Sequence, residues 1–143
     1  MILLDTNLLI RMTRPLDPRC GIARAAIQTY RARGERLVVV PQNLYEFWAV
    51  ATRPLGPPPA GGNGLGMTTG QAAQWLRFIL RRFTFLPDCD QLSQLWLALV
   101  ETHSVTGFRA HDVRLVAAMQ KLWNHPAAYV ERPPLPGPAG DCA

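Results

Sequence analysis

Three acidic residues, Asp5, Glu46 and Asp112, are the side chains whose type and surroundings best suit catalysis. Asp5 directly follows an apolar run, and Glu46 lies within an aliphatic and aromatic segment. A carboxylate in apolar surroundings is costly unless it is paired or bound to a metal ion. Converging carboxylates without matching lysines suit a hard cation such as Mg²⁺ or Mn²⁺, which can polarise a phosphodiester and activate water. These three acids therefore predict a metal-dependent hydrolytic site.

Each of the three acids also has a purely structural interpretation. Asp5 could cap the turn that follows it, and Asp112 could be an acid placed at a helix N-terminus by the helix dipole. Glu46 could be a solvated helix acid or the partner of Arg53. Taken singly, each acid fits structure and function about equally well, so the prediction depends on all three lying at one place.

The positive charge of the chain indicates a nucleic-acid partner. The formal net charge is +5, and of the 15 basic residues only Lys121 is a lysine. The arginine guanidinium is a planar fork that suits phosphate oxygens, and basic domains often bind nucleic acid. An arginine-rich, lysine-poor composition also arises from coding bias, so charge alone favours this partner only modestly.

Histidine and cysteine add no metal site. The 3 histidines lack the spacing of a zinc site, although His111 stands next to Asp112. The 3 cysteines, Cys20, Cys89 and Cys142, form no C-x-x-C pair. Neither a disulfide framework nor a structural zinc site is indicated.

The length of 143 residues predicts one domain. No apolar run approaches the roughly 18 residues that cross a membrane. The N-terminus has no basic segment before its apolar residues, so we expect neither a secretory signal nor a membrane partner, and a cytoplasmic location.

Apolar spacing predicts strands that alternate with helices, hence a parallel α/β sheet covered by helices. We expect strands at residues 1–4, 37–40 and 83–86, and helices at 8–12, 19–33, 44–52, 68–80, 90–103 and 109–123. In such sheets the ligand site lies beyond the carboxyl ends of the strands. Asp5 ends the first strand, Glu46 lies in the first turn of the helix after the second strand, and Asp112 lies early in the last helix.

Local signals give further detail on these elements. Asn7 is expected to cap the first helix, residues 41–43 to form a turn, and the Pro/Gly-rich residues 55–66 to form a loop. The helical spacing predicts a buried stripe on each of several helices. In the helix at 19–33 it consists of Ile22, Ala23, Ala26, Ile27 and Tyr30, and in the last helix of Leu115, Val116, Met119 and Leu122.

Four ordered segments resemble the PIN-domain family, especially the VapC-like toxins of bacterial toxin–antitoxin pairs. They are residues 3–7 (LLDTN), 40–47 (VPQNLYEF), 51–54 (ATRP) and 111–118 (HDVRLVAA). Residues 63–67 (NGLGM) also resemble the loop that precedes the middle helix of these toxins. The likeness covers roughly residues 1–122, and the four matches in order are a much stronger signal than the D-T-N motif alone.

The resemblance implies a PIN-like (Rossmann-like) α/β/α sandwich and a Mg²⁺- or Mn²⁺-dependent endoribonuclease. It assigns the metal-binding and catalytic acids to Asp5, Glu46 and Asp112, and a polar group beside the metal to Thr6. It also implies an RNA substrate, a homodimer, and a cognate antitoxin that inserts a segment at the active site. A nuclease for DNA, and a degenerate PIN domain that binds antitoxin or RNA without cleaving, remain alternatives.

The C-terminal part departs from the family pattern, so the last strand or strands are expected to be altered or missing. Residues 127–130 could form a shortened strand, which would place Glu131 where the family carries a fourth acidic or amide group. Alternatively, a frameshift after about Met119 has replaced the natural C-terminus, an explanation that the abrupt change and the Pro/Gly-rich end favour slightly. We therefore expect a nuclease domain over residues 1–131 and a disordered tail over 132–143.

Overall fold

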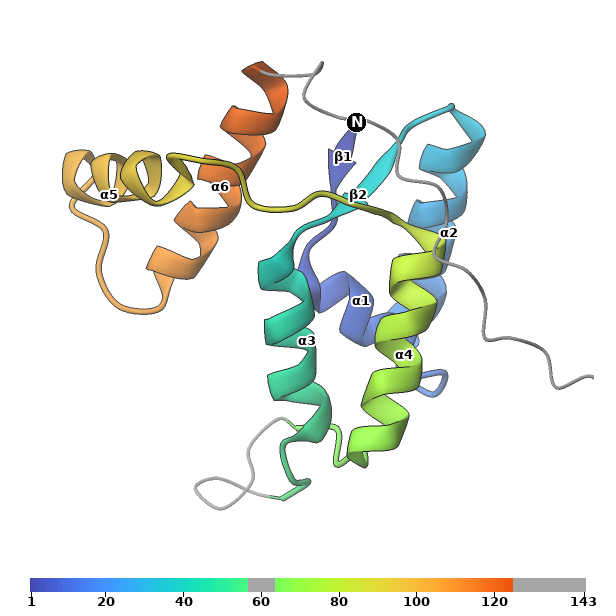
Figure 1. Ribbon diagram of the computed structural model, residues 1–143. Coiled ribbons are helices and arrows are strands. Elements are labelled where there is room, and N and C mark those ends of the chain that lie inside the picture. The colour runs from blue at the N-terminus through green and yellow to red at the C-terminus, as the bar shows by residue number, and fades with distance from the viewer. Residues whose placement is uncertain (57–63, 125–143) are drawn as a thin grey trace, which may run out of the picture.

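The computed structural model describes residues 1–56 and 64–124, and over these residues the protein is a mostly helical α/β structure with a small parallel sheet (Figure 1). Several sequence predictions fall outside the described residues. They are the strand at 127–130, Glu131, the tail at 132–143, residues 57–63 of the predicted loop, and Cys142. In the part of the chain that is described, no helix is long and apolar enough to cross a membrane.

The sheet of the described chain contains β1 (Ile2–Leu3), β2 (Leu37–Val39) and β3 (Thr84–Phe85), in the spatial order β1-β2-β3. Both neighbouring pairs are parallel, with Leu3 opposite Val38 and Val39 opposite Phe85. The three strands lie within the ranges that the sequence predicts, and the prediction of a parallel sheet is confirmed. Their carboxyl ends therefore meet at one edge.

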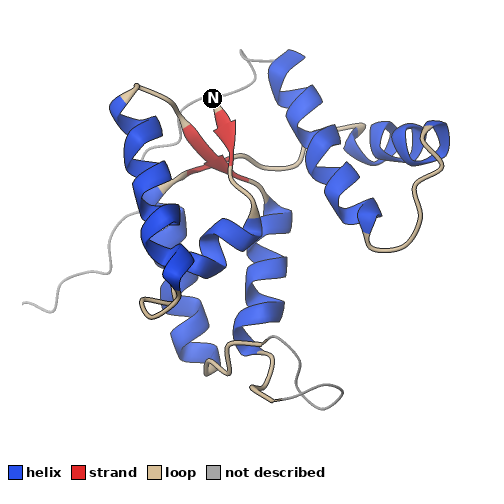
Figure 2. Cartoon of the chain, turned by 180° about the vertical axis from the view of Figure 1, so that it is seen from behind, coloured by secondary structure: helices blue, strands red, loops and turns tan. Residues whose placement is uncertain are grey.

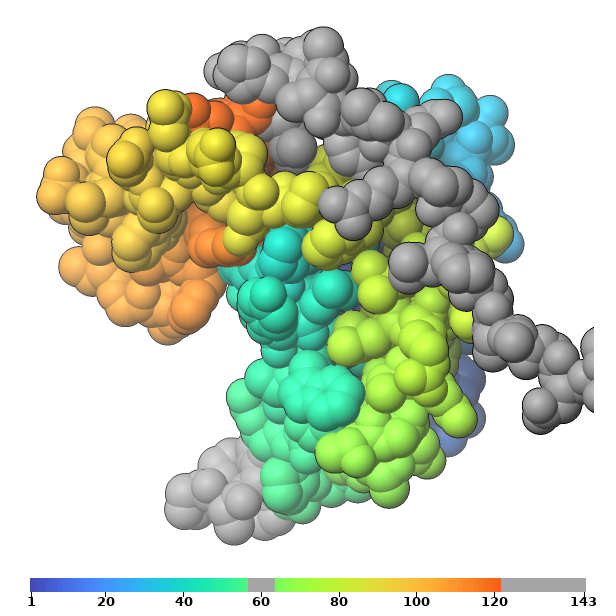
Figure 3. All heavy atoms as spheres, in the orientation of Figure 1, coloured from blue at the N-terminus to red at the C-terminus, as the bar shows by residue number. Residues whose placement is uncertain are grey.

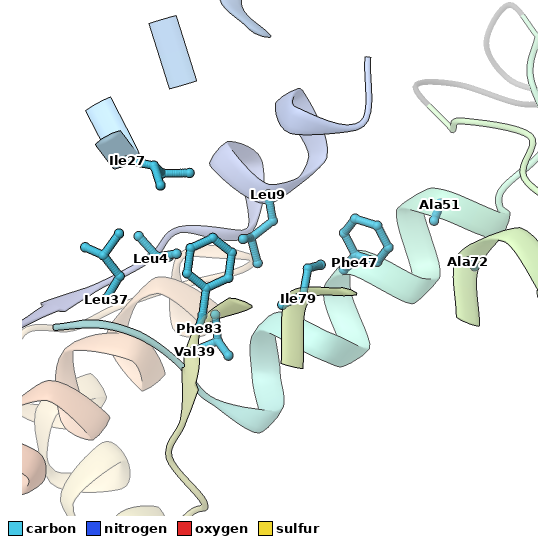
Figure 4. Close-up of a cluster of buried hydrophobic side chains, with 10 residues drawn as sticks. All are labelled: Leu4, Leu9, Ile27, Leu37, Val39, Phe47, Ala51, Ala72, Ile79 and Phe83. Carbon is cyan, nitrogen blue, oxygen red and sulfur yellow. The ribbon is translucent and has the colours of Figure 1, made fainter. Parts of the chain in front are cut away.

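Two groups of helices cover the two faces of this sheet (Figure 2). The helices are α1 (Thr6–Met12), α2 (Pro18–Ala32), α3 (Pro41–Thr52), α4 (Thr69–Arg82), α5 (Leu92–Thr102) and α6 (Arg109–Asn124). Because side chains alternate along a strand, Leu37 and Val39 point into the core under α1 to α4, shown in Figure 4. Val38 and Val40 point into a second core with α5 and α6.

The space-filling view shows α3 and α4 side by side on one face, with the segment that leads into α5 next to α3 (Figure 3). The end of the 55–66 loop is held against α3, because the backbone N–H groups of Leu65 and Met67 donate to the carbonyl groups of Val50 and Ala51 at 3.0 and 2.8 Å. These bonds use carbonyl groups that the last turn of a helix leaves without a partner inside the helix.

Two helix starts differ from the sequence prediction. Helix α1 begins at Thr6 and is capped by Asp5, so the assignment of the cap to Asn7 was wrong. Helix α3 begins at Pro41, so residues 41–43 are its first turn and not a separate turn. Proline suits the first helical position, since its fixed φ is helical and its missing N–H would have no partner there.

The buried stripes of α2 and α6 also differ in part from the prediction. In α2, Ile22 and Tyr30 are 70% and 39% exposed, whereas Ala23 and Ile27 are buried as expected. In α6, Leu115 packs against the core, but Val116 and Met119 are 47% and 44% exposed, and small residues take the inner positions instead. These are Ala117 and Ala118, which let the helix approach the sheet closely. The side chain of Leu122 lies outside the described part.

Candidate active site

Asp5 is an exposed residue at the end of β1, where it caps α1. Its Oδ1 atom accepts a hydrogen bond of 2.8 Å from the backbone N–H of Asn7. A carboxylate at this position satisfies one of the helix N–H groups and is stabilised by the helix dipole. The structural interpretation of Asp5 as a cap is therefore confirmed, and its place beyond a strand end also agrees with the site prediction.

Glu46 joins α3 to the start of α1. It is half-buried and lies in the second turn of α3, one turn later than predicted, because the helix begins earlier. Its Oε2 accepts a hydrogen bond of 2.7 Å from the hydroxyl of Thr6, and its Oε1 accepts one of 2.6 Å from Nε2 of Gln42. Glu46 thus contacts the residue that follows Asp5 directly.

The fully buried side chain of Asn43 supports the contact between Thr6 and Glu46 through three hydrogen bonds. Its amide nitrogen donates to the carbonyl of Leu4 at 3.0 Å and to the hydroxyl of Thr6 at 3.2 Å. Its Oδ1 accepts from the backbone N–H of Val40 at 2.8 Å. Asn43 therefore ties together the ends of two neighbouring strands, and it orients the hydroxyl that donates to Glu46.

Asp112 is exposed in the first turn of α6, as the sequence predicts. Its helix is tied to α3 through Gln42. The amide nitrogen of Gln42 donates to the backbone carbonyl of His111 at 2.9 Å, and its Oε1 accepts from Arg114 at 3.1 Å. Arg114 also forms an ion pair with Asp88.

The structure thus attaches the segments that carry all three predicted acids to one polar cluster at the carboxyl edge of the sheet. The cluster consists of Thr6, Gln42, Asn43, Glu46 and Arg114. Over residues 1–56 and 64–124, however, no three His, Cys, Asp or Glu side chains are gathered closely enough to hold a metal ion. The oxygen donors suit Mg²⁺ or Mn²⁺ in kind, while both oxygens of Glu46 are engaged by protein donors. Glu131 lies outside the described residues.

The sequence prediction missed the roles of Gln42, Asn43 and Arg114. Pro41 was a signal for Gln42, because a proline that opens a helix puts Gln42 and Glu46, four residues apart, on the same helical face. Asn43 had no such signal, since it bonds to Leu4 and Thr6 over 39 and 37 positions of sequence. For Arg114 there was no such local signal, since its contact with Gln42 joins residues that are 72 positions apart.

No protein-family model matches the chain, and no curated protein matches it.

Proposed function

We propose that this protein is a Mg²⁺- or Mn²⁺-dependent endoribonuclease with a PIN-like fold, and that it acts as the toxin of a toxin–antitoxin pair. RNA is then its substrate, a cognate antitoxin its inhibitor, and a homodimer its assembly. The order of the motifs in the sequence supports this proposal, and so does the parallel α/β architecture.

One observation carries the proposal, and it is the hydrogen bond between Thr6 and Glu46 across 40 positions of sequence. It connects the end of the first strand to the helix after the second strand. The bond from Gln42 to the backbone of His111 adds the start of α6. The segments that carry the three acids are therefore joined at one edge of the sheet, which is where parallel sheets build their sites.

The proposed roles follow from these positions. Asp5, Glu46 and Asp112 would hold the ion, which when bound supplies a polarised phosphodiester and an activated water. Thr6 and Gln42 orient the carboxylate of Glu46 through its two oxygens. Outer groups of this kind commonly change metal affinity or activity by about 10- to 100-fold.

The test is cleavage of single-stranded RNA with Mg²⁺ or Mn²⁺ in the parent chain and in Asp5→Asn. Asparagine caps a helix as well as aspartate does, so this substitution removes the charge and keeps the cap. Asp17→Asn is the matched control, because Asp17 caps α2 through the same 2.8 Å bond and is not part of the cluster. We expect a loss of about 100-fold or more for Asp5→Asn and no change for the control.

Cleavage that survives both chelation and Asp5→Asn would show that the nuclease assignment is wrong. Glu46→Gln and Asp112→Asn extend the test to the other two acids. A single-stranded DNA substrate in parallel decides between an RNA and a DNA nuclease.

A second candidate function is a degenerate PIN domain that binds antitoxin or RNA and does not cleave. The engagement of both Glu46 oxygens by Thr6 and Gln42 favours it, together with the lack of a gathered acidic trio in the described chain. Calorimetric titration with Mn²⁺ separates the two candidates. Saturable binding that Asp5→Asn weakens supports the nuclease, and no saturable binding supports the degenerate domain.

A further inference from the structure

A cavity of about 440 Å³ lies between α5, α6 and the segment that enters α5. Its lining includes Asp88, Leu92, Ser93, Trp96, His111 and Arg114. The volume is within the range of about 300–1,000 Å³ that is usual for small-molecule sites. Such sites combine apolar walls with a few polar groups, and this cavity has that composition.

The apolar wall of the cavity is held in place. Leu92 is buried, and the half-buried indole of Trp96 donates a hydrogen bond of 2.9 Å to the backbone carbonyl of Ala110 in α6. This bond restricts rotation of the indole, so a ligand that packs against it pays little of the entropy of ordering a side chain. An aromatic, preorganised wall favours a flat ligand that can stack.

The charges in the cavity argue against a phosphate as the group that enters it. The guanidinium of Arg114 is already paired with the carboxylate of Asp88. The other polar groups named in the lining, the hydroxyl of Ser93 and the imidazole of His111, add no second guanidinium or ammonium group. The ion pair and these polar groups can instead exchange hydrogen bonds with the edge of a neutral heterocycle.

The cavity adjoins the proposed active site through Gln42. Two residues of its lining, His111 and Arg114, are hydrogen-bonded to the amide of Gln42, and that amide also donates to Glu46. A group bound in the cavity is therefore separated from the catalytic acid by one side chain. In RNA one sugar joins each base to its backbone phosphate, so a base in the cavity would keep its own phosphate near this acid.

We propose that this cavity binds one unpaired nucleobase of the substrate, with Trp96 as its stacking surface. The inference rests on the proposed nuclease function for its biological meaning, but binding of a nucleoside is a property of the folded chain that can be measured without metal or cleavage.

A second cavity, of about 490 Å³ along α4, provides the matched control. Its described lining also contains aromatic rings, those of Trp75 and Phe78, but it includes no charged side chain and none of the residues of the polar cluster. Ser93→Trp places a bulky side chain in the first cavity, and Gln74→Trp does the same in the second. Both positions are exposed, so both variants are expected to fold.

The experiment titrates the four ribonucleosides, and separately inorganic phosphate, into the full chain without metal, with ¹H–¹⁵N spectra as the readout. We expect millimolar, saturable binding of at least one nucleoside, with shifts at the indole of Trp96. Stacking on an aromatic side chain is worth about 1–3 kcal/mol per base, so Trp96→Leu should weaken binding by about 5- to 150-fold. Ser93→Trp should weaken binding by at least about tenfold, because it fills the same cavity, and Gln74→Trp should leave it unchanged.

Three results would overturn the proposal. They are no saturable binding of any nucleoside at millimolar concentration, equal binding by the parent and Ser93→Trp, and binding of phosphate alone at Trp96. Because the assay contains no metal and no cleavable bond, a failed cleavage assay with intact nucleoside binding counts against the nuclease only. Cleavage without nucleoside binding counts against the base site only.

Discussion

Replacement of Asn43 by alanine tests the buried hydrogen-bond network that supports the candidate site. The substitution removes the partner of two backbone groups, the carbonyl of Leu4 and the N–H of Val40, as well as the contact with Thr6. Each buried backbone group left without a partner costs about 1–3 kcal/mol. We therefore expect Asn43→Ala to lower the free energy of unfolding by about 2–6 kcal/mol, a large share of the about 5–15 kcal/mol of a typical domain.

The assay is urea unfolding followed by circular dichroism, with midpoints and slopes compared between variants. Gln28→Ala, on an exposed position of α2, is the control and should change stability by less than about 0.5 kcal/mol. A loss of stability for Asn43→Ala no larger than that of the control would refute the reasoning, since it would mean that the two backbone groups do not depend on this amide.

Asn43→Asp gives the same site a distinctive pH dependence. The new carboxyl group would be fully buried, and one of its oxygens would face the oxygen atoms of Leu4 and Thr6 where the amide nitrogen now donates. These two effects oppose the single hydrogen bond from the N–H of Val40, so we expect the pKa in the folded state above the unfolded value of about 3.9. The folded state then binds more protons than the unfolded state. The free energy of unfolding is therefore retained below about pH 4 and decreases as the pH rises through the folded pKa. The total decrease is about 1.4 kcal/mol for each unit by which folding raises the pKa. A variant as stable at pH 7 as at pH 4, relative to the parent, would contradict this account.

Two further predictions concern packing. Gly64→Ala should lower stability by about 1–3 kcal/mol, because its Cβ would lie 2.2 Å from the backbone oxygen of Arg53. Gly21→Ala should instead raise stability by about 0.5–1 kcal/mol, because Gly21 lies in α2 and nothing is within 4 Å of the added Cβ. Thermal unfolding of both variants measures this difference, and a shift of the same sign in both would contradict it. Phe47→Ala removes a fully buried ring from the core shown in Figure 4 and should cost about 3–5 kcal/mol in urea unfolding, so a cost under about 1 kcal/mol would be inconsistent with its burial.

Local signals in the sequence were sufficient to predict the strands, the order of the helices and the positions of two of the acids. Every residue of β2 is apolar, a pattern that predicts a strand covered on both faces. Every residue of β2 is indeed buried. Asp5 follows β1 and Asp112 lies in the first turn of α6, as expected from the neighbouring residues alone. These features depend on propensity and periodicity, which are properties of a few adjacent residues.

The buried faces of the helices were predicted less well, because two neighbouring sets of apolar positions in a helix can often each form the buried face. In α6 the sequence favours Val116 and Met119, yet the inner positions are taken by Ala117 and Ala118. The sheet beneath α6 carries the medium-sized side chains Val38 and Val40, and small residues on the helix allow close contact with them. Which side chains face the sheet depends on the shape of the opposing surface, and that surface comes from other parts of the chain.

Apart from the local bond between Gln42 and Glu46 within α3, the contacts of the polar cluster were decided by the tertiary structure. The contacts from Gln42 to His111 and to Arg114 join residues that are 69 and 72 positions apart. No periodicity predicts such pairs, because each forms only after the sheet has brought α3 and α6 to the same edge. The three acids of the candidate site could thus be named from the sequence, whereas the bond from Thr6 to Glu46 and the link from Gln42 to α6 depend on contacts between distant segments.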